Sequence, residues 1–287
     1  MKKMRLNGIG SEEADIKNKL IALQGMQIAP SIQFSGFFRH YLFLEGEGAV
    51  LHRLRLFPDC NTGIVFNFSS PLNLDGQLLP DAFAYGQITE YKDIDCHGPA
   101  RLFVVVVRPD GFNRLLGLPA GELRDKVVSL ADIFGDRVVS LQQGIADACT
   151  VSESIALVED FFGRLVEGRS LAANPLVEAS LQLIQKNNGL IAVGQLADGL
   201  GCHKRQLERQ FMAAVGLSPK RYCNIVRAHT FLKHLPEGAS LTGYAYDSGY
   251  YDQAHLIREF KQITGLTPSQ YLKKTDPLAV NFLRMKV

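Results

Sequence analysis

Side chains able to form directional hydrogen bonds recur at helical spacing in the last third of the chain. Arg205, Glu208 and Arg209 follow an i, i+3, i+4 pattern, which places them on one face of a helix. Gln253 and Arg258 lie in a second segment of similar pattern. Arginine can pair with guanine O6 and N7, glutamine with adenine N6 and N7, and glutamate with cytosine N4. The two segments therefore carry the chemistry needed to recognise base edges of a duplex.

Patterns that would indicate an enzyme do not occur in the sequence. A metal-dependent barrel enzyme needs a close His-x-His with a carboxylate and a further histidine, whereas His40, His52 and His97 are isolated. There is no G-x-S-x-G, P-loop or G-x-G-x-x-G. Cys96 and His97 are adjacent, and neighbours on a strand point to opposite faces. We expect no catalytic residues, no metal and no cofactor, and the ligand-binding residues stay unassigned.

The two polar segments belong to a duplicated unit. Leu207-Glu-Arg-Gln-Phe211 recurs 49 residues later as Leu256-Ile-Arg-Glu-Phe260. Apolar residues at i, i+4 and i+7 predict a half-buried helix in each copy. Gly216 and Gly265 would end these helices in the left-handed conformation, and a proline three residues later would begin the next helix. A fixed-period repeat indicates a duplicated structural unit.

A shorter helix is expected ahead of each of these segments. Ala197 and Gly201 match Ala245 and Gly249 at an offset of 48 residues. Two helices joined by a short glycine-containing turn form a helix-turn-helix, whose second helix can enter a DNA major groove. A linker helix from Pro219 to about residue 235 would join the two units.

The repeated Leu-x-Arg-x-Phe, Gly-Leu-Ser/Thr-Pro and Tyr pattern resembles the AraC/XylS family of bacterial transcription regulators over about residues 175–274. The resemblance implies a seven-helix domain with two helix-turn-helix units that bind double-stranded DNA. It implies base-reading side chains at these positions: Arg205, Glu208, Arg209, Gln253, Ala254, Ile257 and Arg258. Three positions depart from the family pattern: Leu256 replaces an aromatic residue, Ala254 a small hydroxyl residue, and His203 a serine N-cap.

Basic side chains around the two segments are candidates for phosphate contacts or plain solvated charges. They are His203, Lys204, Lys220, Arg221 and Lys261. Arg209 and Arg258 could contact a base or a phosphate, or pair with acidic neighbours in a structural role. Residues 175–287 contain 14 Lys/Arg and 8 Asp/Glu, a net charge of +6, while the whole chain has +2. A basic C-terminal part fits a polyanionic partner.

The first half of the chain predicts a β-rich domain. Short aromatic and β-branched segments around residues 34–43, 50–57, 63–68, 82–89 and 101–108 are separated by turn residues. Two amphipathic helices, 138–148 and 152–166, would follow. The apolar stripe of the second (Ile155, Val158, Phe162 and Leu165) could pack in the core or form a dimer seam. Phe103 to Phe112, Leu115 to Pro119 and Leu130 to Gly135 resemble an uncharacterised cupin-like domain found ahead of AraC-type domains.

Composition supports a globular chain without a membrane span. Hydrophobic residues make up 46% and charged residues 21%, and no apolar run is long enough to cross a bilayer. The basic N-terminus is not followed by an apolar signal core. Five widely spaced cysteines without C-x-x-C are expected to be reduced structural thiols. We therefore expect a cytoplasmic location.

Taken together, the sequence predicts a multidomain α+β protein. An N-terminal segment (1–27) precedes a β-barrel, cupin-like domain with flanking helices (28–168), which senses a ligand or oligomerises. A linker (169–174), an all-α AraC-type DNA-binding domain with two helix-turn-helix units (175–275) and a tail (276–287) follow. The hypothesis is a bacterial transcription regulator.

The sequence is compatible with several partners and with more than one function. The partners would be DNA, a small-molecule effector, a second copy of the chain and, for an activator, RNA polymerase. One alternative gives the first domain only a dimerisation role, without a ligand. Another is a cupin-like enzyme fused to a helical partner-binding domain.

Overall fold

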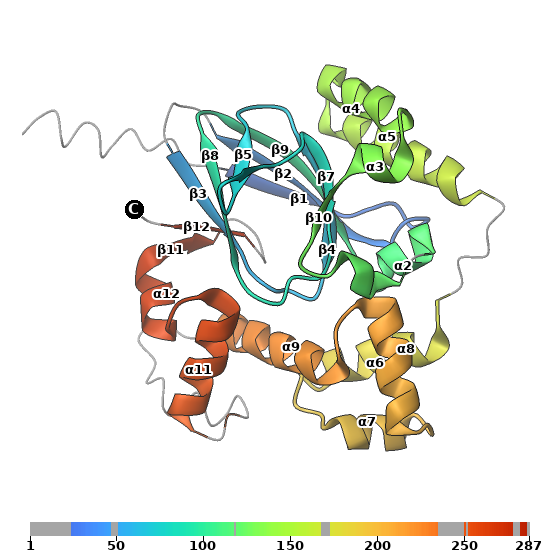
Figure 1. Cartoon of the computed structure of the whole chain (residues 1–287), viewed down its shortest axis with the longest axis vertical. Helices are drawn as coiled ribbons and strands as arrows, with labels where there is room; N and C mark the ends of the chain where they lie inside the picture. Colours follow the sequence, from blue (N-terminus) through green and yellow to red (C-terminus); the bar gives the residue numbers. More distant parts are fainter. Residues whose placement is uncertain are drawn as a thin grey trace, which may run out of the picture.

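Two facing antiparallel sheets make up most of the first domain in the computed structural model (Figure 1). The structure describes residues 24–46, 51–117, 119–167, 173–234, 250, 252–277 and 282–285. One sheet has the strand order β1-β2-β9-β4-β7-β10, and the other β11-β12-β3-β8-β5-β6. The strands are β1 Gln24–Ile28, β2 Phe38–Gly46, β3 Leu51–Leu56, β4 Thr62–Asn67, β5 Leu72–Leu74, β6 Gln77–Leu78, β7 Ala82–Tyr85, β8 Lys92–His97, β9 Ala100–Val107, β10 Val127–Ser129, β11 Thr275–Pro277 and β12 Phe282–Met285.

Strand β9 lies at the centre of the first sheet, and its run of valines is buried on both faces. Val104 and Val106 belong to the apolar cluster between the sheets, together with Leu54 and Leu56 of β3. Val105, like the other odd-numbered residues of this run, faces the cluster beneath the flanking helices. Alternate side chains of a strand point to opposite faces, so an unbroken apolar run suits a strand covered on both sides.

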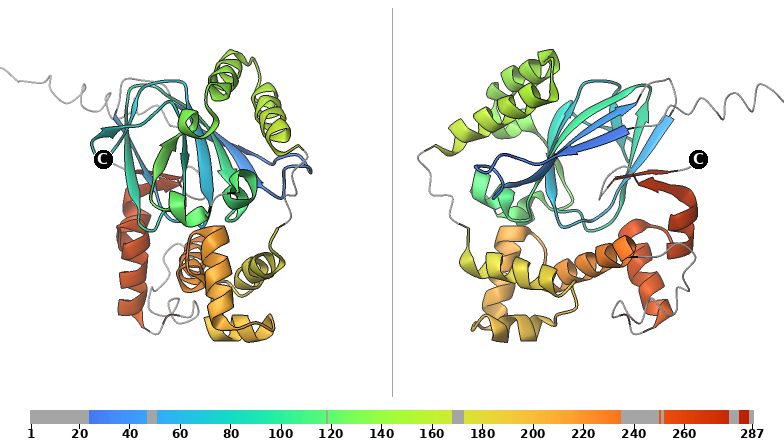
Figure 2. Two further views of the ribbon diagram at one scale, coloured as in Figure 1. Left: turned by 45° about the vertical axis from the view of Figure 1, so that its right-hand side comes forward. Right: turned by 180° about the vertical axis from the view of Figure 1, so that it is seen from behind.

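Three helices cover the outer face of the first sheet (Figure 2). They are α3 (Leu130–Phe134), α4 (Arg137–Asp147) and α5 (Val151–Val166). A capping box begins α5, in which Thr150 Oγ1 accepts from the Glu153 N–H at 3.2 Å and the Glu153 carboxylate accepts from the Thr150 N–H at 3.3 Å. Val158 and Phe162 are 0% and 1% exposed, and Phe162 meets Phe38 and Phe134 edge-on. The apolar stripe of α5 is therefore core packing.

The second domain is helical, as the repeat predicts. Between the two domains lie α2 (Gly111–Leu116) and the 3-10 turn η1 (Ala120–Leu123). The helical domain contains α6 Pro175–Lys186, α7 Val193–Gly199, α8 Lys204–Val215, α9 Pro219–His234, α11 Gln253–Thr264 and α12 Pro268–Lys274. The expected linker helix is α9. Residues 235–249 lie outside the described residues, so Ala245 and Gly249, with the first helix expected in the second unit, are not placed.

The end of the chain returns to the β-rich domain. Where the sequence predicts only a tail, β11 pairs with β12, and β12 pairs with β3 from Phe282 opposite Leu56 to Arg284 opposite Leu54. The second sheet therefore combines strands from residues 51–97 with strands that follow the helical domain. Nothing in the described part of the chain is a helix both long and apolar enough to cross a membrane.

The position of Phe162 in the aromatic cluster gives the first prediction. Replacing Phe162 with alanine leaves a cavity among Phe38, Phe134 and Phe161, and we expect the free energy of unfolding to fall by about 3–5 kcal/mol. Val139→Ala on neighbouring α4 is the control, because Val139 is 58% exposed. Urea unfolding measures both variants. Equal small losses would show that α5 does not pack in this core.

Candidate nucleic-acid interface

Helix α8 has the form that the repeat predicts. Leu207 and Phe211 are 0% exposed and pack in the core of the helical domain. Gly216 ends the helix in the left-handed conformation, with φ of 82°, and its N–H bonds to the Met212 carbonyl. His203 occupies the N-cap without a capping side-chain hydrogen bond. Helix α7 and the turn at Gly201 precede α8, so the first helix-turn-helix unit is complete.

Helix α11 repeats this construction. The Asp252 side chain caps its start by accepting a hydrogen bond from the His255 N–H at 2.6 Å. Leu256 and Phe260 are fully buried, and Gly265 ends the helix with φ of 73°. The buried stripe turns the intervening side chains outward, as it does in α8.

The seven base-reading candidates lie off the buried stripes of their helices. Arg205, Arg209, Gln253, Ala254 and Arg258 are exposed, and Glu208 and Ile257 are half-buried. Glu208 lies 3.9 Å from Lys204 in an exposed i, i+4 ion pair, which is weak in water. Arg209 and Arg258 form no ion pair with another described residue, so the structural-pairing alternative has no support in this part of the chain.

Four of the five phosphate candidates are also exposed. They are His203, Lys204, Lys220 and Lys261. Arg221 differs because it is half-buried and its Nη2 donates to the Thr89 carbonyl of the β-rich domain. This arrangement gives Arg221 a role at the contact between the domains, and a phosphate contact stays only a prediction.

The linker helix α9 positions α11 through a buried ion pair. Arg227 Nη2 lies 2.5 Å from Glu259 Oε2, and Asn224 Nδ2 donates to Glu259 Oε1 at 2.9 Å. The side chains of Arg227 and Glu259 are only 10% and 15% exposed. Removing one member of such a pair leaves an uncompensated charge, so the angle between α9 and α11 is strongly specified.

The β-rich domain contacts the C-terminal ends of both repeated helices. At the end of α8, a Cβ atom on Gly216 would lie 2.9 Å from the Ala120 carbonyl oxygen of η1. At the end of α11, a Cβ atom on Gly265 would lie 2.5 Å from the Tyr91 ring. Each glycine therefore serves two purposes, because it allows both the left-handed cap and the close approach of the other domain. We call these two contacts the end contacts.

Arg55 organises the end contact at α11. Its guanidinium makes two hydrogen bonds of 2.6 Å to the Asp93 carboxylate across β3 and β8, and its Nη1 donates to the Thr264 carbonyl at 3.1 Å. The guanidinium also lies 4.2 Å from the centre of the Tyr91 ring. One side chain thus joins the second sheet to the last turn of α11.

A loop between β3 and β4 enters the core of the helical domain. Phe57 and Cys60 belong to the same apolar cluster as Phe211 and Tyr222. The ring of His229 on α9 stacks on Phe57 at 5.2 Å, and its Nε2 lies 2.7 Å from the Pro58 carbonyl. Burial raises the pKa of the Cys60 thiol well above its usual value. All five cysteines are unpaired thiols; Cys60, Cys96 and Cys223 are buried, as expected for structural thiols, whereas Cys149 is exposed.

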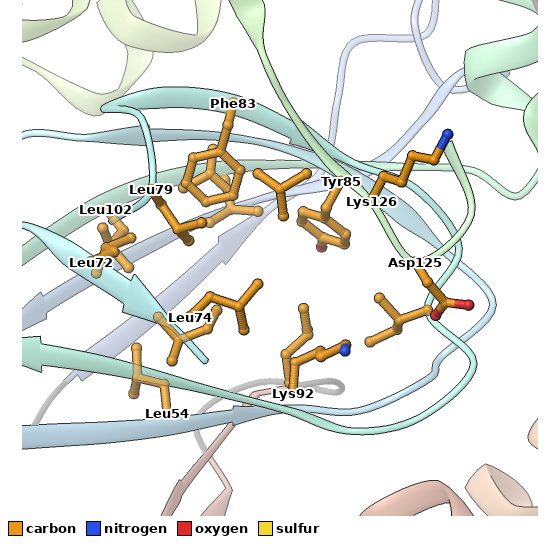
Figure 3. Close-up of a pocket in the computed structure, with 16 residues that line it drawn as sticks. Leu54, Leu72, Leu74, Leu79, Phe83, Tyr85, Lys92, Leu102, Asp125 and Lys126 are labelled. Carbon is orange, nitrogen blue, oxygen red and sulfur yellow. The ribbon is translucent and has the colours of Figure 1, made fainter. Parts of the chain in front are cut away.

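An apolar cavity lies between the two sheets (Figure 3). Its volume is about 40 Å³, and its walls include Leu54, Leu72, Leu79, Phe83 and Leu102. Lys92, Asp125 and Lys126 border it at one end. The sequence gives no direct signal for this cavity, because its lining comes from seven strands and the segments between them. No group of metal-ligating side chains occurs among the residues that the structure describes.

The border of the cavity is joined to the end contacts. Asp125 accepts hydrogen bonds from the Thr89 N–H at 2.7 Å and from its Oγ1 at 2.8 Å. Thr89 in turn accepts from Arg221 of α9, and Tyr91 lies against Gly265. The segments 86–92 and 120–127 therefore line the cavity on one side and contact α8, α9 and α11 on the other.

Comparisons with known proteins support the assignment of the C-terminal part. Residues 196–274 match a family described as a helix-turn-helix domain, and residues 26–129 match a domain of unknown function (DUF6597). A putative AraC-like transcription regulator of Streptomyces lividans is 30% identical over 103 residues, which are 35% of this chain and 34% of the relative. The regulatory protein ada of Salmonella typhimurium is 27% identical over 92 residues, 32% of this chain and 26% of that protein.

The solved structures that are similar to this chain share little sequence identity with it. ToxT from Vibrio cholerae has a TM-score of 0.44 with 12% identity and covers 81% of this chain and 98% of its own. The C-terminal domain of AraT from Geobacillus stearothermophilus has a TM-score of 0.33 with 23% identity, covering 35% of this chain and 85% of its own. The chain spans about a third of the length of the first two curated relatives. Its C-terminal region is a helix-turn-helix domain of the AraC type, preceded by a domain of unknown function.

Proposed function

We propose that this chain is a DNA-binding transcription regulator that contacts two adjacent major-groove segments of one duplex. The observation that carries the proposal is the pair of exposed polar faces on α8 and α11, built from the same repeated segment. The linker helix α9 has 16 residues, which corresponds to a rise of about 24 Å. With the width of the flanking units, the two faces would match major-groove segments about one helical turn, roughly 34 Å, apart.

The β-rich domain would govern how these two faces are presented. The end contacts tie both helices to segments that border the apolar cavity, which supports modulation by a ligand that alters those segments. In the second possibility, the β-rich domain binds no ligand and affects the presentation of the two faces through dimerisation alone. If the chain is an activator, RNA polymerase would be a further partner, and the site of action would be the cytoplasm of a bacterium.

The alternative of a cupin-like enzyme fused to a helical partner-binding domain requires a metal. Measuring metal in the purified full chain separates the two proposals. Stoichiometric metal that survives dialysis would favour the enzyme, whereas duplex binding without metal would favour the regulator.

Electrostatics gives a prediction for the affinity. Each phosphate neutralised by a lysine or arginine contributes a slope of about −0.9 to log K against log salt. Because Lys204, Lys220 and Lys261 are exposed around the two helices, we expect the affinity of the full chain for duplex DNA to fall steeply with salt. Filter binding across a salt series measures the slope, and an affinity independent of salt would contradict the proposed interface.

The chemistry of the two faces predicts unequal base preference. The α8 face offers Arg205, Glu208 and Arg209, whereas the α11 face includes Ala254 and Ile257, which sense little beyond a thymine methyl group. Selection from a random duplex pool should yield a sharp preference at the first segment and a looser, T/A-rich one at the second. Loss of a bidentate arginine contact costs about 1–3 kcal/mol of discrimination.

Two substitutions separate base contacts from phosphate contacts. Arg205→Ala should flatten the preference at one position of the selected site, and Lys261→Ala should weaken binding to selected and random duplexes alike. Competition assays on both duplexes measure this difference. Equal losses on both duplexes for Arg205→Ala would refute its role as a base reader.

The end contact at α11 gives a matched pair of variants. Arg55→Met removes the bond to the Thr264 carbonyl and the contact with Tyr91, whereas Arg53→Met removes an exposed ion pair with Asp95 two residues along the same strand. A charged hydrogen bond is worth about 1.5–3 kcal/mol. We therefore expect Arg55→Met to weaken binding to a two-segment duplex by roughly tenfold and Arg53→Met to have little effect. Identical affinities for both variants would show that the end contact does not position α11.

A further inference from the structure

A cavity of about 670 Å³ lies where the β-rich domain meets α6. One wall is formed by the neighbouring ends of β2, β9 and β4, and the other by α6. Sites for small molecules usually have volumes of about 300–1,000 Å³ and are common at domain junctions. This cavity is distinct from the apolar one between the sheets, because its lining carries charged and amide side chains.

Two arginines project from adjacent positions on the strand wall. Arg39 lies at the irregularity in the pairing of β2 with β9, between Phe38 opposite Val107 and the next pair. Arg108 directly follows Val107, and its N–H donates to the Phe37 carbonyl at 2.8 Å. Antiparallel pairing therefore brings the two side chains to the same end of the sheet.

Neither guanidinium group forms an ion pair within 4.0 Å among the described residues, although Arg108 lies near enough to Asp110 to act on the pKa of that carboxyl. Arg39 makes one hydrogen bond of 3.4 Å, to Asn61 Oδ1, and both arginines are exposed. A third arginine in the lining, Arg114, already has several partners. It donates to the Gly36 carbonyl at 2.7 Å, lies 3.7 Å from Asp110 and stacks over the Phe37 ring. Arg114 therefore reinforces the positive potential, while Arg39 and Arg108 are available to a ligand.

The opposite wall supplies neutral polar groups. Gln182 and Gln185 on α6 are exposed and line the cavity, and Gln185 Nε2 donates to the Tyr222 hydroxyl at 3.4 Å. Glu178, one turn earlier, is the acidic side chain of this wall. Amide groups can donate to and accept from a polar ligand, and Leu181 adds apolar surface to the same wall.

We infer that this cavity binds a small polyanion with carboxylate or phosphate groups. Arg39 and Arg108 would hold its oxyanion, because a guanidinium fork matches carboxylate and phosphate oxygens with two hydrogen bonds. The amides of α6 would bind its polar body. The bound anion would bridge the β-rich domain and the first helix of the DNA-binding domain. A regulatory effect of this anion rests on the proposed function, whereas the binding of the anion to the cavity does not.

Duplex DNA is the competing partner for two exposed arginines. The arginines border a cavity of small-molecule size with walls from both domains, whereas a duplex would need an open basic face. The geometry therefore favours a compact anion.

The test uses the full chain without DNA, with pyrophosphate and citrate as probes at constant ionic strength. Isothermal titration calorimetry should show saturable binding of at least one probe, and the preferred probe distinguishes phosphate from carboxylate chemistry. The double variant Arg39→Gln/Arg108→Gln should bind that probe at least about tenfold more weakly, since two charge-assisted contacts are lost. Arg137→Gln, an exposed arginine at the start of α4, should bind it as the natural chain does.

Unfolding midpoints verify that the natural chain, the double variant and Arg137→Gln are folded. If the double variant is not folded, Arg39→Gln and Arg108→Gln are measured separately. The inference is overturned if neither probe saturates or if the arginine variants bind as tightly as the control. It is also overturned if these variants lose only duplex affinity, equally on selected and random DNA, because the arginines would then contact DNA phosphates. These titrations contain no DNA, so they test the anion site independently of duplex binding. If the chain binds a probe but binds no duplex in a separate assay, the proposed function is refuted and the inferred anion site is not.

Discussion

The close approach of the β-rich domain to the ends of α8 and α11 is the constraint on which the arrangement of the two repeated helices depends. Gly216 and Gly265 lack a Cβ atom at the points where Ala120 and Tyr91 lie against the helices. A larger residue there would both strain the left-handed cap and push the domains apart. Each of the two helices is therefore contacted at its C-terminal end by the β-rich domain, in addition to its connection to the linker helix.

Through these contacts, a change in the β-rich domain can alter the positions of α8 and α11, which carry the two polar faces. The hydrogen bonds between Asp125 and Thr89 join the two segments that carry the end contacts, and the same segments border the apolar cavity. A change in their separation would act on α8 through Ala120 and on α11 through Tyr91. Under the proposed function, a ligand or partner that shifts the equilibrium between two arrangements must bind them with different affinities, and these contacts would transmit the difference.

The local pattern of the sequence predicts the helical domain well, because each repeated helix has its own buried stripe and terminating glycine. It predicts less of the β-rich domain. Strand β8 is absent from the predicted strands although Asp93 and Asp95 alternate with the buried Ile94 and Cys96, because the alternation covers only a few residues and aspartate is unfavourable in strands. The stacking of Phe57 on His229 and the bond from Arg55 to Thr264 join residues more than 170 positions apart. No local pattern encodes such contacts, so the end contacts and the cavity between the β-rich domain and α6 could not be predicted from the sequence.

Measuring the distance between α8 and α11 tests the central claim most directly. Spin labels on ketone-bearing unnatural residues at the exposed positions Ala213 and Gln262 avoid the native cysteines. Pulsed electron paramagnetic resonance on the full chain without DNA should give one narrow distance distribution, which broadens when Arg55 is replaced by methionine. A distribution equally broad with and without Arg55 would contradict the account, because the β-rich domain would then not hold the two helices.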